Sequence, residues 1–224
     1  MKRFLRDNGL VLFFGAIFLL ALGGQAVAGL HDFNDGQISD GAAPVSFATY
    51  LTSSDFGADV AENWQSEYLQ FALYILATVH LVQRGSPESK PLGQEGTESD
   101  EDQKVGRHAD ADSPAPARAG GAWLWWYSNS LGLTMGLIFL GSWIAQAVAG
   151  RTAYNAVQLR DYQDPLGLGE YLASPDFWNR TLQNWQSEFL AILSMALLSI
   201  YLRQRGSPDS KPVGGAHSAT GIEG

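Results

Sequence analysis

The sequence predicts an all-α integral membrane protein with four transmembrane helices, arranged as two tandem helical hairpin repeats of parallel orientation. Three observations support this fold class: an ungapped internal repeat, four apolar stretches without charge, and an uneven distribution of lysine and arginine along the 224 residues.

The internal repeat recurs at a constant spacing of 121 residues. Segments 8–93 and 129–214 are identical at 38 of 86 aligned positions, with no gap. The longest shared strings are Gln-Ala-Val-Ala-Gly at 25–29 and 146–150, Asn-Trp-Gln-Ser-Glu at 63–67 and 184–188, and Arg-Gly-Ser-Pro at 84–87 and 205–208. A duplication without insertions predicts two copies of one structural unit.

Each copy contains two apolar stretches. Residues 10–30 and 131–150 reach the ~20 residues that cross a bilayer as a helix. Residues 68–83 and 189–202 are shorter, and each alone resembles a buried soluble helix equally well. Because each shorter stretch follows a longer one in both copies, we predict that all four span the membrane.

The N-terminus also resembles a secretory signal peptide, because a basic start precedes an apolar core and Ala26-Val27-Ala28. The same small residues recur at 146–150, in mid-chain, where no signal peptide lies. We therefore expect the first helix to be retained.

The repeats are joined by a segment of different composition. Residues 88–112 carry eight acidic and three basic side chains among Gly, Ser and Pro, which favours a solvated chain over a packed one. The predicted organisation is one membrane repeat over 1–93, an acidic flexible cytoplasmic linker over 94–121, a second repeat over 122–214, and a disordered tail over 215–224.

The distribution of basic residues predicts the topology. With four spans, eleven of the fourteen Lys and Arg residues lie on the side of the termini and the linker, and residues 31–62 carry none. The positive-inside rule then places both termini in the cytoplasm. Both hairpins share one orientation, so the duplication is parallel.

Each outer loop ends at a helix start. Ser174-Pro175-Asp176 places a capping serine before a proline at the first helical position, and Ser53-Ser54-Asp55 is the matching copy. We predict long helices over about 54–84 and 175–205, each ended by the Arg-Gly-Ser-Pro string.

Four polar residues are predicted near the outer ends of the spans: Gln25, Glu67, Gln146 and Glu188. The simpler interpretation is that they support helix packing among small residues. The alternative is a cluster between the repeats that forms an outward-facing site for a cation or proton. Trp64 and Trp185, inside the repeated pentapeptide, are predicted interfacial anchors, and a ligand or partner surface is the alternative.

The sequence indicates no enzyme chemistry. Cysteine is absent, the four histidines show no metal-ligand spacing, and no phosphate loop or nucleophile motif occurs. We therefore expect no catalytic residues, metal or cofactor. No basic patch with interleaved aromatics predicts nucleic-acid binding. The expected partners are the lipid bilayer and either a second copy or an unknown membrane protein.

The three repeated strings, with the Lys-Pro that follows each Arg-Gly-Ser-Pro, resemble an uncharacterised family of small bacterial multi-pass membrane proteins, a domain of unknown function with an internal duplication. The resemblance covers nearly the whole chain and implies the bacterial inner membrane. It implies no activity, cofactor or site residue. The function we expect is a structural or accessory envelope component acting through helix packing. The alternative is a small oligomeric transporter or channel.

Overall fold

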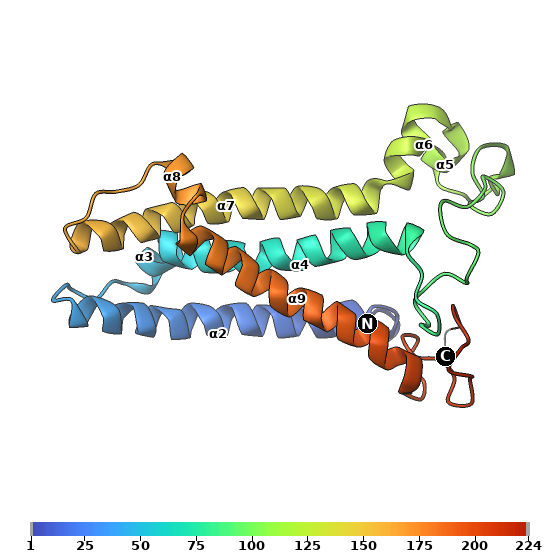
Figure 1. Ribbon diagram of the computed structural model, residues 1–224, viewed down its shortest axis with the longest axis horizontal. Helices are drawn as coiled ribbons and strands as arrows, with labels where there is room; N and C mark the ends of the chain where they lie inside the picture. The colour runs from blue at the N-terminus through green and yellow to red at the C-terminus, as the bar shows by residue number, and fades with distance from the viewer. Residues whose placement is uncertain (1, 223–224) are drawn as a thin grey trace. The chain divides into compact units, whose positions relative to one another are not determined.

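The computed structural model describes residues 2–222, and all regular structure within them is helical (Figure 1). The all-α class is therefore confirmed. The helices are α1 Lys2–Asp7, α2 Gly9–Ser39, α3 Phe47–Leu51, α4 Ser54–His80, η1 Gly106–His108, α5 Ala115–Ala119, α6 Gly121–Ser128, α7 Ser130–Arg160, α8 Leu168–Leu172 and α9 Pro175–Tyr201.

Within residues 2–222, two helices, α2 and α7, are long and apolar enough to cross a membrane. The shorter apolar stretches lie within α4 and α9, each 27 residues long with polar N-terminal halves. The structure therefore provides two candidate spans, and the other two stay predictions.

The chain forms two compact units that do not follow the order of the sequence. One contains the residues up to Val60 together with Ala145–Leu168, and the other contains Ala61–Ile144 together with the residues from Gly169 onward. Helices α4 and α7 each contribute to both units.

The core of the first unit is built around Tyr50 of α3, which is 3% exposed. Its ring packs against Phe33 of α2 and Phe56 of α4, at centroid distances of 5.5 and 5.4 Å. Its hydroxyl lies over Gly29 of α2, where any β-carbon would collide with it. Because Gly29, the last residue of the first Gln-Ala-Val-Ala-Gly string, has no side chain, the Tyr50 hydroxyl can lie directly against the α2 backbone.

The second unit contains an aromatic cluster between α7 and α9. Trp143 of α7 packs against three rings of α9, those of Phe177, Trp178 and Trp185, at centroid distances of 6.0 to 6.2 Å. The Trp143 indole also donates a hydrogen bond to Thr181 Oγ1 at 3.4 Å. These contacts fix α7 against α9 within this unit.

The predicted helix starts are confirmed. Ser53 Oγ accepts a hydrogen bond from the Phe56 amide at 3.2 Å, and Ser174 Oγ accepts one from the Phe177 amide at 3.3 Å. Each serine satisfies an amide at the start of α4 or α9 that has no partner inside the helix.

The predicted helix ends are wrong by four residues, since α4 ends at His80 and α9 at Tyr201. The amide of Gln83 donates instead to Ser89 Oγ at 2.8 Å, and that of Gln204 donates to Ser210 Oγ at 2.9 Å. A serine of the following loop therefore takes an amide that a continuing helix would use.

Candidate functional site

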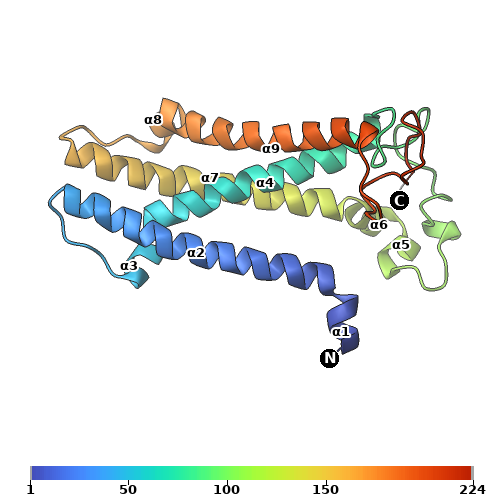
Figure 2. The same ribbon diagram turned by 90° about the horizontal axis from the view of Figure 1, so that it is seen from below.

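The second unit contains a polar network between α4 and α9, close to the repeated Asn-Trp-Gln-Ser-Glu pentapeptides (Figure 2 shows the two helices). Glu62 of α4 accepts hydrogen bonds from Arg180 Nη1 at 3.0 Å and from Asn184 Nδ2 at 3.2 Å, both on α9. The Glu62 side chain is 18% exposed. Partial burial strengthens a charged pair relative to one in open water.

Gln65 lies one helical turn further along α4 and is completely buried. Its Oε1 accepts a hydrogen bond from the indole Nε1 of Trp185 at 2.8 Å, while its Nε2 has no partner within the part of the chain that is described. The tryptophan of the second pentapeptide thus binds the glutamine of the first.

The two pentapeptides lie in different environments although they have the same sequence. Gln65 and Ser66 are buried, whereas their counterparts Gln186 and Ser187 on α9 are exposed. The Ser187 hydroxyl bonds to Asn184 O within its own helix. The α9 copy therefore presents an amide side chain at the surface where the α4 copy buries one.

The four predicted site residues are distributed over both units. Gln25 and Gln146 belong to the first unit, and Glu67 and Glu188 belong to the second. Whether all four converge stays a prediction. Glu67 is exposed and Glu188 is half-buried.

Gln146 is the most buried of the four predicted site residues. It is 1% exposed, and neither Nε2 nor Oε1 has a hydrogen-bond partner among the described residues. An unpaired buried amide costs roughly 1–3 kcal/mol. Gln25, its counterpart on α2, is half-buried.

The two predicted anchors differ in exposure. Trp64 is 41% exposed, whereas Trp185 is half-buried and contacts both Trp143 and Gln65. The anchor role of both stays a prediction, and Trp185 also joins α9 to α4 and α7 within the second unit.

Sequence analysis did not identify Glu62 and Arg180 as site residues. It also did not predict that Gln65 is buried and bonded to Trp185. One signal was available, because Arg180 is one of only three basic residues assigned to the outer side. An arginine there favours acidic partners: Asp176 lies four residues earlier on the same helix, and Glu62 immediately precedes the repeated pentapeptide.

No group of three or more histidine, aspartate or glutamate side chains able to hold a metal occurs among residues 2–222. The described structure therefore provides no candidate metal centre, and the candidate site is a network of hydrogen bonds and ion pairs in which Arg180 pairs with both Glu62 and Asp176.

Comparison with known proteins places the chain in a family. The family model described as a domain of unknown function, DUF6766, matches residues 1–222. No curated protein matches the chain, and no solved structure matches it.

Proposed function

The chain belongs to the DUF6766 family, and we propose that it is a non-enzymatic protein of the bacterial inner membrane that acts through helix packing. In this proposal four spans form two tandem hairpins of the same orientation, with both termini in the cytoplasm. The protein serves as a structural or accessory component of the cell envelope.

Membrane insertion is supported by the exposure of the two apolar helices. Only 6% of the most apolar window of α2 is buried, and 17% of that of α7. A core helix of a soluble protein would be mostly buried. Exposed residues such as Leu10, Leu20 and Leu137, at 70–77%, instead suit contact with lipid chains.

The absence of cysteine makes the topology directly testable, since any introduced cysteine is unique. We expect Asp35→Cys and Asp161→Cys to react with an impermeant maleimide in intact cells, and Asp100→Cys to react only after permeabilisation. Labelling of residue 100 in intact cells would overturn the proposed topology.

The observation that carries an assembly role is the exposed Gln186 on α9. A glutamine near the outer boundary of a membrane helix gains from a hydrogen-bonding partner. The matching Gln65 has one in Trp185, and no hydrogen bond of Gln186 is found within the described structure. A second copy of the chain, presenting the same face, provides such a partner.

The test is disulfide crosslinking in membranes. We expect Gln186→Cys to give covalent dimers on mild oxidation, and the buried equivalent Gln65→Cys to give none. If Gln186→Cys crosslinks only to a different membrane protein, the assembly is with that partner. If it crosslinks to nothing, the assembly role is wrong.

One observation favours the alternative of a small oligomeric transporter or channel. Gln146 carries a buried amide without a hydrogen-bond partner among the described residues, and a bound ion or water is one explanation for such a group. In this alternative Gln25, Glu67, Gln146 and Glu188 together bind a cation or proton. The Glu67→Gln/Glu188→Gln double variant would then abolish ion or proton flux in proteoliposomes, whereas unchanged flux removes the alternative.

A further inference from the structure

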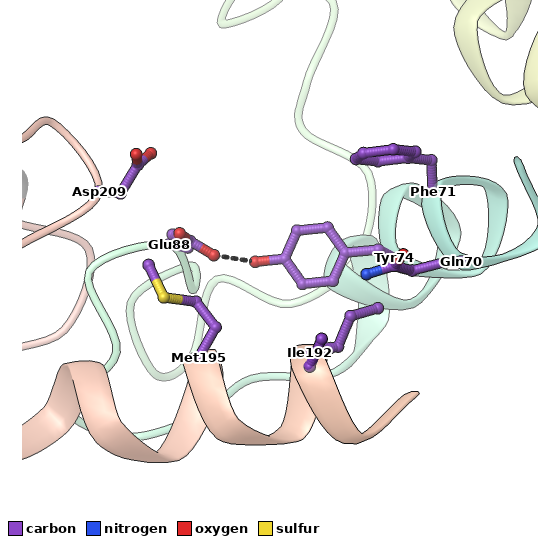
Figure 3. Close-up of a pocket in the computed structure, with 8 residues that line it drawn as sticks. Gln70, Phe71, Tyr74, Glu88, Ile192, Met195 and Asp209 are labelled. Carbon is purple, nitrogen blue, oxygen red and sulfur yellow. Dashed lines mark hydrogen bonds between the residues drawn. The ribbon is translucent and has the colours of Figure 1, made fainter. Parts of the chain in front are cut away.

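A cavity of about 400 Å³ lies in the second unit, between the C-terminal halves of α4 and α9 and the loops that follow them (Figure 3). This volume falls within the ~300–1,000 Å³ typical of sites for small molecules. The lining residues are Gln70, Phe71 and Tyr74 of α4, Ala191, Ile192 and Met195 of α9, and Glu88 and Asp209 of the loops.

The lining follows the internal repeat. The eight residues form four pairs, and the two members of every pair are 121 positions apart: 70 with 191, 71 with 192, 74 with 195, and 88 with 209. Equivalent positions of both copies thus enclose one space. The wall pairs differ in residue type, whereas the loop pair is acidic in both copies.

The loops bring the two carboxylates to the cavity by the same local structure. Glu88 directly precedes Ser89, and Asp209 directly precedes Ser210. Each serine hydroxyl accepts a hydrogen bond from the backbone amide of a glutamine just after the helix end, Gln83 or Gln204. Each of these serines also donates to the carbonyl of the next residue, at 3.1 Å in both loops. The loop backbone is therefore held in the same way in both copies.

The lysines next to these serines are bonded elsewhere. Lys90 Nζ donates to Gly96 O at 2.6 Å and pairs with Glu98 at 2.5 Å. Lys211 Nζ donates to the carbonyls of Gly85 at 2.6 Å and His217 at 2.9 Å. Within the described residues neither Glu88 nor Asp209 has a salt-bridge partner, so two negative charges face the cavity without a cation.

The remaining walls are largely apolar. Figure 3 shows the Tyr74 ring on one side, with its hydroxyl directed at Glu88, and Ile192 and Met195 of α9 on the other. The Tyr74 hydroxyl donates to Glu88 Oε2, which holds that carboxylate in place and leaves its second oxygen available. Phe71 adds a second aromatic ring to the lining.

We propose that this cavity binds a small organic cation that carries an ammonium group on an apolar body. The carboxylates would receive the ammonium group, and the Phe71 and Tyr74 rings would add cation–π attraction. The body would pack against Ile192 and Met195. An anion is disfavoured because no lysine or arginine lines the cavity. A divalent metal is disfavoured because Mg²⁺ and Ca²⁺ take about six or more oxygen ligands, and the two carboxylates sit among apolar walls.

The test is equilibrium dialysis of phenethylammonium against the full-length protein in an uncharged maltoside detergent. We expect saturable binding that the Glu88→Gln/Asp209→Asn double variant weakens at least tenfold. Its matched control is Glu101→Gln/Asp112→Asn, which removes two acidic charges outside the cavity and should bind like the original protein. The neutral analogue 2-phenylethanol should not compete.

A lipid headgroup can supply the same ammonium chemistry as a free amine. Binding in nanodiscs of phosphatidylglycerol alone, compared with nanodiscs that include phosphatidylethanolamine, separates the two sources. Competition by phosphatidylethanolamine identifies the headgroup as an occupant, and its absence identifies a soluble amine. Equal binding by both double variants, with helix content unchanged by circular dichroism, would overturn the cation site. That result leaves membrane topology and assembly unaffected, since neither depends on Glu88 or Asp209.

Discussion

At the scale of single residues, Lys211 shows how a buried charge is accommodated without a carboxylate. The side chain is 1% exposed, and the three N–H groups of its ammonium are shared among four backbone carbonyls, those of Gly85, Ala216, His217 and Ala219. Hydrogen bonds of this kind offset part of the cost of removing a charge from water. They also fasten the C-terminal segment to the loop after α4.

A substitution at Gly85 tests whether this contact holds the C-terminal segment in place. Gly85 has φ of +86°, and a β-carbon there would overlap His217 O. Gly206, its counterpart, has φ of +82° but no neighbour within 4 Å of that position. Because both substitutions add similar backbone strain, about 1–2 kcal/mol, their difference reports the overlap with His217 O and with Ile200 Cγ2, which lies 3.0 Å from the same position.

We expect Gly85→Ala to speed hydrogen exchange at the Gly221 amide, which donates to Ser86 O at 3.0 Å, by at least tenfold. Gly206→Ala should leave that exchange near the original rate. Equal exchange in the two variants, measured by mass spectrometry, would show that the tail does not depend on this contact.

Tyr171 predicts a pH dependence of stability. Burial raises the pKa of this phenol, and donation of its hydroxyl to Asp176 at 2.9 Å raises it further. The folded state therefore holds this proton more tightly than the unfolded state does. The stabilisation is fully present below about pH 10, the ordinary pKa of tyrosine, and is lost as the pH rises through the folded value.

Thermal unfolding in detergent checks this prediction. We expect Tyr171→Phe to cost about 1 kcal/mol at neutral pH and to show a smaller alkaline decline than the original protein. Some decline should remain, because burial also raises the pKa of Tyr50. An identical alkaline decline in both proteins would rule out Tyr171 as its source.

At the scale of helices and loops, structural features set by residues close in the sequence were predictable. Features set by residues further along the chain were not. The starts of α4 and α9 were predictable because Ser53 and Ser174 act on amides three residues away. The ends were not, because the decisive hydroxyls lie six residues beyond the amides that they bind. In the candidate site, Gln65 was missed because its partner Trp185 is 120 residues away.

The outer loops contain a feature that the repeat could have indicated. Asn34 bonds both backbone groups of Val45, at 2.7 and 3.1 Å, and Asn155 bonds both of Leu166, at 2.8 and 2.9 Å. The two asparagines are 121 residues apart, and so are the two loop residues. The identity of Asn34 and Asn155 was the available signal, since the other residues of 30–36 differ from their counterparts in 151–157.

Substituting each asparagine in turn gives two experiments, and each serves as the control for the other. We expect Asn34→Ala to speed hydrogen exchange at the Val45 amide at least tenfold and to leave Leu166 unchanged. Asn155→Ala should do the opposite, because each loop amide loses only its own acceptor. If either variant accelerates exchange in both loops equally, the asparagines do not act as separate loop fasteners.

At the scale of the whole molecule, both compact units combine residues of the two sequence repeats. In the first unit, Arg160 forms an ion pair with Asp40, and Ala149 lies 3.8 Å from the β-carbon position of Gly57. In the second, the Glu62–Arg180 pair joins α4 to α9. Neither repeat therefore contains a complete unit, and we expect neither to be stable alone.

Self-pairing of the first repeat would not replace these contacts. The position equivalent to Arg180 is Asp59, and the position equivalent to Arg160 is Ser39. Two copies of residues 1–93 would thus place Glu62 opposite an acidic residue and leave Asp40 without its arginine. The two repeats share many residues, but the charges that join them differ between the copies.

Co-expression of residues 1–93 and 122–224 as separate chains tests this interdependence. We expect an affinity tag on one fragment to co-purify the other from membranes, and each fragment alone to accumulate several-fold less because unpaired chains are degraded. Arg180→Asp in the second fragment should weaken co-purification, because Glu62 then faces an acidic residue in place of its arginine. If residues 1–93 accumulate equally well alone, each repeat is a folding unit and the contacts between repeats are secondary to those within them.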